Sequence, residues 1–529
     1  MSHQPTMAEL ISINEKLKKQ HEEDMLTITK LTAQMGHLQK MLFAPKTEKK
    51  KVLYPDDADS PEISLFNEAE AESDLPLETD SAQEKTTEVK AHRRKKRTAK
   101  SREEILGNLP HKKVIHDLTE EEKICQACGH PLVPMGEKLI RIEVIYHPAT
   151  IEIIDHMVKT YECRECRKDD KPYIVMPKVD NPVIPHSYAS SSAVAHAIVQ
   201  KYIYAMPLYR QEKEWANYNV PIPRTTLANW VILATDAWLM PIAELMHREL
   251  LLQPSIHIDE TPVQVHKVKG KANHSKSYMW VYTSGKYEKE RRIILFDYQP
   301  GRSGDNARKY LEGYNGYFHT DDFSGYGKLD PNRHCLCWAH ARRQFVNCKV
   351  PGISSYEGTL VQEGINRIAA IYKTDNLLND LPPETRKLMR QGKEKEQVEE
   401  FFAWAKKVFP TVLPKSGIGR ALLYSISNEQ NLKRYLTDGI CEIDNNPAEN
   451  SIRPFTIGRK NWLFCDTPKG AQASAAAYSI LETCVANGID PEKYLNYVFT
   501  KLPNEEWPRR ETTLEKYLPW SPEIQKECK

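Results

Sequence analysis

Residues 255–266 of the chain read SIHIDETPVQVH, and their pattern gives the first evidence for the fold of the central part of the molecule. Apolar and polar residues alternate along its first half, a pattern that predicts a β-strand. Successive side chains of a strand point to opposite faces, so His257 and Asp259 share one face while Ile256 and Ile258 share the other. Asp259 is therefore expected to point away from the core that the two isoleucines enter.

Strand-like and helical segments follow this stretch in a regular order. Residues 277–285, SYMWVYTSG, and 291–299, RRIILFDYQ, are bounded by polar or Gly-containing turns, which predicts a three-stranded meander. A short helix is expected at 304–314, a strand running into a turn at 315–326, and a strand leading into a helix at 334–345.

This order matches the ribonuclease-H-like fold, in which one acidic residue lies on the first strand and a second lies near the end of the fourth. Asp259 and Asp321 occupy these two places. Asp322 directly follows Asp321 and has the same chemistry, so the residues alone leave both open as the second acid.

A third acidic residue lies beyond a long helical stretch, residues 347–443, which we interpret as an inserted domain. After it, Asn446 is expected to cap a helix, Pro447 suits the first helical position, and Glu449 follows three residues after the cap. Two interpretations of Glu449 stay open. It is either a metal ligand or the member of a capping box that reaches back to the backbone of the cap residue.

The segment before the strands has helical periodicity. PLYRQEKEWANY (207–218) and TTLANWVILATDAWL (225–239) are separated by a Pro-containing turn, which resembles a helix-turn-helix. The residues that open its second helix are the candidate DNA contacts: Arg224, Thr225, Thr226 and Asn229. The alternative is an ordinary helical hairpin of the core, and Trp230 and Leu233 are expected to be buried in both cases.

Two CxxC pairs flank a β-rich stretch and predict a zinc ribbon. Each pair lets a tight turn direct two thiolates at one tetrahedral Zn²⁺ ion. The expected ligands are Cys125, Cys128, Cys163 and Cys166. Two redox pairs or unrelated buried thiols are the alternative.

The N-terminal region combines a heptad pattern with a charged linker. Apolar residues recur at core positions from Met7 to Leu42, which predicts a short coiled coil, or else a single amphipathic helix packed on its own protein. Residues 56–88 are acidic and poor in apolar side chains, as in disordered linkers. The following block, HRRKKRTAKSR (92–102), contains seven Lys and Arg residues that either bind DNA phosphates or form a solvated tail.

Composition indicates a modular intracellular protein. The 529 residues exceed one core, and 74 basic against 72 acidic side chains nearly cancel in total but are segregated along the chain. No apolar signal segment and no uncharged apolar run of about 18 to 20 residues is found. The eleven cysteines then fit a reducing cytoplasm better than a disulfide framework.

Several motifs resemble insertion-sequence-66 (IS-66) family transposases, which belong to the DDE class. The catalytic part of the resemblance rests on HIDETPVQV, HTDDFSGY, CWAHARR and NNPAENSIRPFTIGRKNWLF. LFAPKTEKK after the heptads, the two CxxC pairs, RTTLANW and the terminal YLPW occur in the family's order as well. The resemblance covers nearly the whole chain.

The resemblance implies a triad of Asp259, Asp321 and Glu449, followed by a basic motif that contains Arg453, Arg459 and Lys460. These three cations are candidate contacts for scissile or flanking DNA phosphates, and the alternative is that each is a solvated surface cation or part of a structural ion pair. Family members usually have Gly directly after the second acid, where this chain has Asp322. Three carboxylates suit two Mg²⁺ or Mn²⁺ ions, which would stabilise both the entering and leaving oxygens of DNA cleavage and strand transfer. The implied partners are the terminal inverted repeats, target DNA, a second copy of the chain and accessory proteins of the same element, in a bacterial cytoplasm at the nucleoid.

Two other functions remain compatible with the residues. One is a zinc-containing DNA-binding regulator with an inactive ribonuclease-H-like domain, and the other is a structure-specific nuclease of the same fold.

Two residues of the CWAHARR motif, Trp338 and His340, have two interpretations. They stack on a displaced base or orient a phosphate, or else they are a buried aromatic residue and a histidine whose hydrogen bonds are satisfied within the protein.

The expected architecture is multidomain and mixes α+β and α/β parts, with a ribonuclease-H-like catalytic core that carries a helical insertion. The expected parts are a coiled-coil N-terminus (1–50), a charged linker (51–110), a zinc-ribbon-like domain (111–180), a helix-turn-helix-like module (181–252), the catalytic domain (253–345 and 441–490), the helical insertion (346–440) and a C-terminal segment (491–529).

Overall fold

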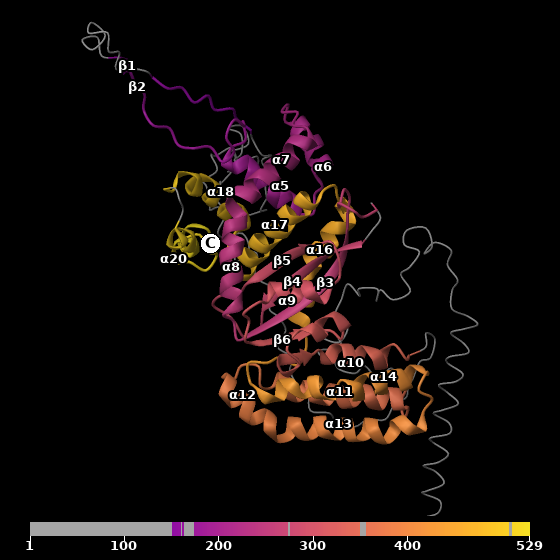
Figure 1. The fold of residues 1–529 in the computed structure, drawn as a ribbon. Helices are drawn as coiled ribbons and strands as arrows, with labels where there is room; N and C mark the ends of the chain where they lie inside the picture. The colour runs from indigo at the N-terminus through magenta and orange to yellow at the C-terminus, as the bar shows by residue number, and fades with distance from the viewer. Residues whose placement is uncertain (1–150, 160, 163–173, 273–275, 350–355, 507–509) are drawn as a thin grey trace, which may run out of the picture. The chain divides into compact units, whose positions relative to one another are not determined.

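The computed structural model describes residues 151–159, 161–162, 174–272, 276–349, 356–506 and 510–529 (Figure 1). The segments predicted as a coiled coil and a charged linker, and the four predicted zinc ligands, lie outside the described residues. Residues 156–529 belong to one compact unit. At its start, β1 (Tyr161–Glu162) and β2 (Ile174–Val175) pair as a short antiparallel ladder.

A mixed sheet forms the centre of this unit. Its strands are β3 (Ser255–Val265), β4 (Lys276–Ser284), β5 (Ile294–Gln299), β6 (Tyr317–Thr320), β7 (His334–Leu336) and β8 (Phe464–Cys465). The order is β5-β4-β3-β6-β7, and β8 pairs with the end of β3. The first three strands are antiparallel, whereas β6 and β7 run parallel to β3. The predicted meander is confirmed.

Helices flank this sheet and close its outer edge. α9 (Gly304–Tyr310) connects β5 to β6, and α10 (Trp338–Val346) follows β7. α17 (Pro468–Ala486) packs on β5, where the amides of Ile294 and Phe296 donate to Thr483 Oγ1 and Ser479 Oγ at 3.0 and 2.8 Å. Side chains of α17 thus satisfy backbone groups of an edge strand that would otherwise need water or another strand.

The helical module before the sheet contains α5 (Ser191–Tyr202), α6 (Leu208–Asn217), α7 (Arg224–Ala234), a π-helical turn (Thr235–Leu239) and α8 (Met240–Leu251). Its apolar side chains share one hydrophobic core with the sheet and with the C-terminal helices. Those C-terminal helices are α18 (Pro491–Lys501), α19 (Glu511–Glu515) and α20 (Pro522–Glu527). Trp230 is buried as expected, but the expectation for Leu233 is wrong, because 46% of that residue is exposed.

One continuous helix of the described residues, Arg224–Leu251, is long and apolar enough to cross a bilayer by length and composition. Its Leu239, Ile242 and Met246 are fully buried, and its segments pack on α5 and α17. These contacts are those of a core helix in a globular unit.

The predicted insertion is helical, and its helices lie side by side (Figure 1). They are α11 (Leu360–Asn376), α12 (Pro383–Met389), α13 (Lys395–Val408), α14 (Gly417–Ser427) and α15 (Glu429–Lys433). A second hydrophobic core joins them to β7 and α10 through Leu336, Trp338 and Phe345. The insertion therefore packs directly against β7 and α10.

α16 (Asn446–Trp462) follows the insertion and returns the chain to β3 and β4. The sequence predicted Asn446 as its cap, and this prediction is wrong by one residue: Asn445 is the cap, and its side chain makes no capping bond. The Asn445 amide instead donates to Ile258 O at 2.8 Å, and its Oδ1 lies 3.0 Å from His257 Nδ1. These buried contacts with β3 outcompete local capping, so no capping box forms.

Candidate active site

Asp259 and Asp321 lie at corresponding places on neighbouring parallel strands. β3 and β6 pair in a register that sets His257 opposite His319. Each aspartate comes two residues later, so both side chains belong to the face of the sheet that carries the two histidines. Asp321 follows directly after β6, where its Oδ1 accepts a hydrogen bond from Phe323 N at 3.0 Å.

Glu449 lies in the first turn of α16 and also comes near Asp259. Burial raises the pKa of Asp259 well above its ordinary value, and the nearby charges of Glu260, Asp321 and Glu449 raise it further. Burial raises the pKa of Asp321 as well, although the Phe323 amide, Arg302 and Arg343 oppose this shift. Asp321 after β6 and Glu449 on α16, both far from β3 in sequence, thus lie near enough to Asp259 for their charges to disfavour its ionised form.

Asp322 points to a different part of the molecule. Its side chain is exposed, and Asn428 Nδ2, which lies between α14 and α15, donates to its Oδ2 at 2.9 Å. Asp321 is less exposed and acts on the pKa of Asp259. Asp321 therefore lies near enough to Asp259 to raise its pKa, whereas Asp322 is directed to the insertion.

Glu449 faces two side chains of α10. Its Oε1 lies 3.6 Å from His340 Nδ1, and its Oε2 lies 3.6 Å from Arg343 Nη2. Both distances exceed ordinary hydrogen bonds. Glu449 Oε1 and His340 Nδ1 are buried and have no hydrogen-bond partner among the described residues. Burial lowers the pKa of His340 to about 4, while Glu449 opposes and Arg343 reinforces this shift.

Glu260 is a fourth carboxylate at this centre, and it was not predicted from the sequence. It is almost fully buried and bound by Arg302, whose Nη2 lies 2.7 Å from its Oε1, and by the hydroxyl of Tyr326. Arg302 also lies over the Phe323 ring, with its Cζ 3.9 Å from the ring centroid. The sequence does contain a signal for it, because Glu260 is a carboxylate on the strand face that otherwise carries the core-facing isoleucines.

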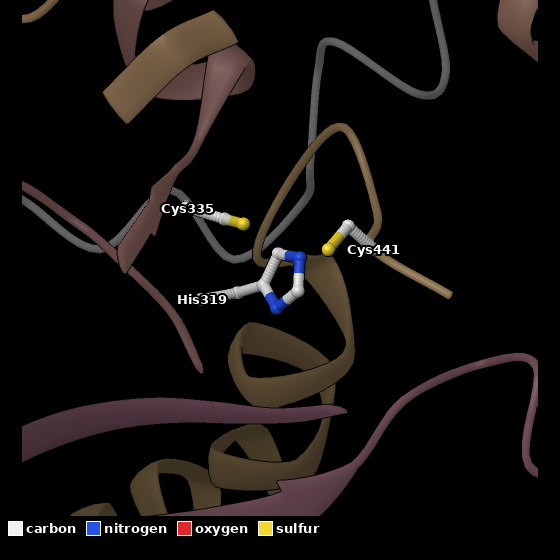
Figure 2. Close-up of side chains that lie close together, drawn as sticks. All are labelled: His319, Cys335 and Cys441. Carbon is white, nitrogen blue, oxygen red and sulfur yellow. The ribbon is translucent and has the colours of Figure 1, made fainter. Parts of the chain in front are cut away.

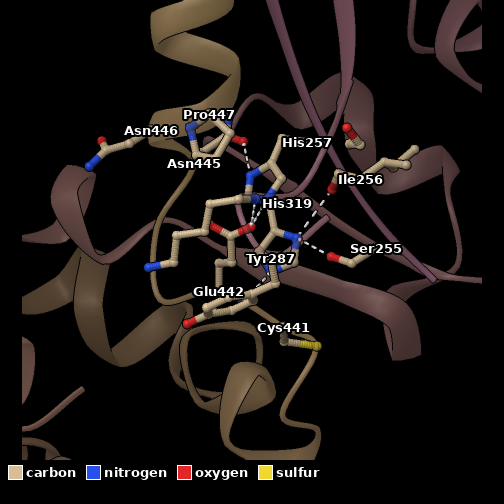
Figure 3. Close-up of polar contacts among 12 residues, drawn as sticks. Ser255, Ile256, His257, Tyr287, His319, Cys441, Glu442, Asn445, Asn446 and Pro447 are labelled. Atoms are coloured by element: carbon tan, nitrogen blue, oxygen red, sulfur yellow. Dashed lines mark hydrogen bonds and ion pairs between the residues drawn. The ribbon is translucent and has the colours of Figure 1, made fainter. Parts of the chain in front are cut away.

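A buried polar network surrounds His257, two residues before Asp259 on β3 (Figure 3). His257 lies between Asn445 Oδ1 and Glu442 Oε1, each 3.0 Å from one of its ring nitrogens. Its ring stacks on His319, whose Nε2 accepts from Glu442 N at 2.9 Å. Burial alone would raise the pKa of Glu442, but His257 and Lys286 hold it at about 2. The network fixes β3, β6 and the start of α16 against one another.

A second buried cluster consists of His319, Cys335 and Cys441 (Figure 2). One nitrogen and two sulfurs lie within 4.8 Å of one another. Burial opposes ionisation of Cys335, but Cys441 and His319 lower the pKa of its thiol to about 6. Both nitrogens of His319 already contact backbone groups, Ile256 O and Glu442 N. The cluster is therefore part of the packed support of β6.

The predicted DNA contacts occupy two helices. Arg453, Arg459 and Lys460 all lie on α16, and Arg459 donates to Thr261 Oγ1 on β3 at 3.1 Å. On α7, Arg224, Thr225 and Asn229 are exposed and Thr226 is half-buried. In CWAHARR, Trp338 is fully buried and donates to Leu432 O at 2.8 Å, which excludes it as a stacking platform for a base.

Comparisons with known proteins agree along the chain. The family model described as "Transposase IS66 family" matches residues 186–473, and "IS66 C-terminal element" matches 479–520. "Zinc-finger binding domain of transposase IS66" matches 122–167, and "Transposase C of IS166 homeodomain" matches 30–114. The zinc-finger match includes all four predicted thiolate ligands.

Three relatives from Sinorhizobium fredii (strain NBRC 101917 / NGR234) resemble most of the chain. Uncharacterized protein y4qI is 26% identical over 78% of this chain and 77% of its own length. Uncharacterized proteins y4hP and y4jD are 24% and 23% identical, covering 76% and 78% of this chain and 74% and 80% of their own lengths. Their names carry no function.

Proposed function

The chain belongs to the IS66 family of transposases, and from that premise we propose that it cuts DNA at the ends of an insertion sequence and joins the freed 3′-hydroxyl to target DNA. Asp259, Asp321 and Glu449 are the proposed catalytic carboxylates. The observation that carries this proposal is their convergence from β3, the end of β6 and the start of α16, with a raised pKa at Asp259. We assign the sheet to the ribonuclease-H-like class on its strand order.

The three carboxylates fit divalent cations of the Mg²⁺ or Mn²⁺ type. Their mutual repulsion favours a bound cation, and Glu449 Oε1 is a buried oxygen without a hydrogen-bond partner in the described part of the chain. When bound, two such ions would supply charge stabilisation at the entering and leaving oxygens of an in-line displacement. Glu260 keeps a different role, because Arg302 and Tyr326 occupy both of its oxygens.

The residues around the carboxylates have separate roles in the proposed reaction. The network of His257, Asn445 and Glu442 holds the aspartate strand and the glutamate helix in a fixed relation. Arg453, Arg459 and Lys460 would bind flanking phosphates, and the exposed start of α7 would contact transposon ends. We assign Cys125, Cys128, Cys163 and Cys166 as the ligands of a structural zinc ion, which the zinc-finger match supports.

A strand-transfer assay with the terminal repeats of the encoding element tests the proposal. Asp259→Asn, Asp321→Asn and Glu449→Gln are each expected to lower joining by more than about 100-fold, since residues that only support metal ligands already cost about 10- to 100-fold. Asp322→Asn is the matched control and should stay near wild type, because its carboxylate binds Asn428. The same preparations should contain zinc, and Cys163→Ser should lose it.

Each other outcome has a defined meaning. Retained joining by any of the three variants removes that residue from the catalytic set. If the wild-type protein binds the ends but leaves no nicks, it is a regulator. If it cleaves DNA without joining it, it is a nuclease.

A further inference from the structure

One turn of α10 supplies a histidine and an arginine to the carboxylate centre. His340 and Arg343 are three residues apart and therefore share a face of the helix. Both face Glu449, His340 through Nδ1 to Oε1 and Arg343 through Nη2 to Oε2, each at 3.6 Å. The two side chains also contact each other, with Arg343 Nη1 lying 3.2 Å from His340 Nε2.

The contact between the two side chains fixes the tautomer of the ring. A guanidinium has only N–H donors, so His340 Nε2 must accept, and the ring proton must lie on Nδ1. That proton faces Glu449 Oε1 across 3.6 Å, too far for a good hydrogen bond. Among these three side chains, the close contact of the His340 ring is therefore the one with Arg343, and this contact orients the guanidinium.

Arg343 differs from the other arginine of the centre in how much of its donor capacity is used. Arg302 contacts Glu260 Oε1 through both Nε and Nη2 at 2.7 Å. Arg343 is 3.6 Å from Glu449 and keeps 34% of its side chain exposed. Its charge also acts on Asp321. Its guanidinium therefore lies near both acids with hydrogen-bond donors still available.

A DNA phosphate that approaches three carboxylates meets strong repulsion, which a nearby cation would offset. Arginine suits this task because its planar fork matches two oxygens of a phosphate. We infer that Arg343 binds the scissile phosphodiester and that His340 is the positioning residue that directs its guanidinium, an inference that rests on the proposed DNA-cleaving function. The ligand class is a phosphodiester anion at the carboxylate centre.

The test measures binding in Ca²⁺, without relying on cleavage. Full-length protein is titrated with end DNA that carries either a normal phosphate or an uncharged methylphosphonate at the scissile position. Wild type should bind the methylphosphonate DNA about tenfold more weakly, as expected for the loss of one charge-assisted contact. In Arg343→Ala this difference should fall below about twofold, and in Arg343→Lys it should be intermediate.

Controls separate this contact from a general loss of charge. Arg420→Ala, at an exposed arginine of α14, should keep the full difference between the two DNAs. An unchanged difference in both Arg343→Ala and Arg343→Lys overturns the inference. Arg343→Lys keeps the charge beside Glu449, so the test survives if the alanine variant is poorly folded.

His340 variants test the positioning role. His340→Gln keeps an acceptor near the place of Nε2 and should retain the discrimination, whereas His340→Leu should lose it. His340, Glu449 and Cys337 also place ligand atoms within 4.8 Å of one another, so metal binding is the rival role of the histidine. Electron paramagnetic resonance of added Mn²⁺ should show equal binding in wild type and His340→Gln. Loss of Mn²⁺ in that variant rejects positioning in favour of ligation.

The proposed function is judged separately by Mg²⁺-dependent cleavage in the same preparations. If wild type fails to cleave, that function fails, while the phosphate comparison still decides the role of Arg343. If wild type cleaves and Asp259→Asn does not, but Arg343→Ala and Arg343→Lys both discriminate like wild type, only the inference on Arg343 is rejected.

Discussion

A carboxyl group outside the candidate active site, that of Glu482, shows how burial changes the pKa of a single residue. Glu482 on α17 is partly buried, and burial raises its pKa to about 7. No compensating charge is among the causes of this shift. The folded protein must therefore either keep this group protonated or bear the cost of a poorly solvated charge.

This residue gives a pH-dependent prediction. Because the pKa of Glu482 is higher in the folded than in the unfolded protein, its carboxyl group does not lower the free energy of unfolding at low pH. The loss of stability grows as the pH rises through the window from about 4.5 to about 7. Glu482→Gln should raise the free energy of unfolding on the order of 2 kcal/mol at pH 8 and hardly at all at pH 4.5. Urea denaturation at both pH values measures this. Glu515→Gln, at an exposed glutamate, is the control, and an equal gain at both pH values would contradict the assignment.

At the scale of elements, the start of α16 is fixed to β3 by one buried amide. Asn445 is 1% exposed and contacts both His257 and Ile258, while its carbonyl accepts from the Glu449 amide at 3.2 Å. The element that carries Glu449 is thereby held against the element that carries Asp259. A helix whose first turn positions a catalytic group depends on such contacts, since helix ends otherwise fray.

Removal of this amide should weaken both stability and the reaction. Asn445→Ala leaves buried polar atoms of His257 and Ile258 without their partner, and we expect the free energy of unfolding to fall by about 2 to 4 kcal/mol. Strand transfer should fall as well at temperatures where the variant remains folded. Asn450→Ala, at an exposed position on α16, should change stability by less than about 0.5 kcal/mol. Equal behaviour of the two variants would show that the amide does not hold the helix.

At the scale of the whole molecule, the arginine of an ion pair buried within the insertion also binds the segment that leads into α16. Arg390 and Asp375 are both fully buried, with Nη2 and Oδ1 2.7 Å apart. Arg390 Nη1 also donates to the carbonyls of Tyr435 and Cys441 at 3.1 and 2.9 Å. The insertion thus organises the residues that precede Glu442 and Asn445.

This connection predicts long-range coupling. Arg390→Met leaves Asp375 buried and unpaired and should lower the free energy of unfolding by about 3 to 5 kcal/mol. Arg390→Met combined with Asp375→Leu removes both charges and should recover much of that loss, although the carbonyl contacts stay lost. Thermal denaturation of the single and double variants measures the coupling. A double variant that is no more stable than Arg390→Met alone would show that the ion pair is not the source of the effect.

Local sequence patterns were enough to predict the strand meander, the helical insertion and the elements on which Asp259, Asp321 and Glu449 lie. Alternation along a strand and periodicity along a helix are local, so a short stretch of residues carries them. The same rules predicted a cap at Asn446 and a buried Leu233, and both predictions were wrong. The first failed because the preceding amide bonds to a strand 187 residues away, and Leu233 is 46% exposed.

Which side chains meet depends on how distant elements pack together. Asp322 binds Asn428, 106 residues away, so two adjacent aspartates of equal local chemistry point to different partners. Glu260 is bound by Arg302 and Tyr326, and Glu449 meets His340 and Arg343 of another helix. The physical reason is that local patterns fix the face on which a side chain lies. The packing of distant elements then sets which charges, donors and acceptors share a buried space.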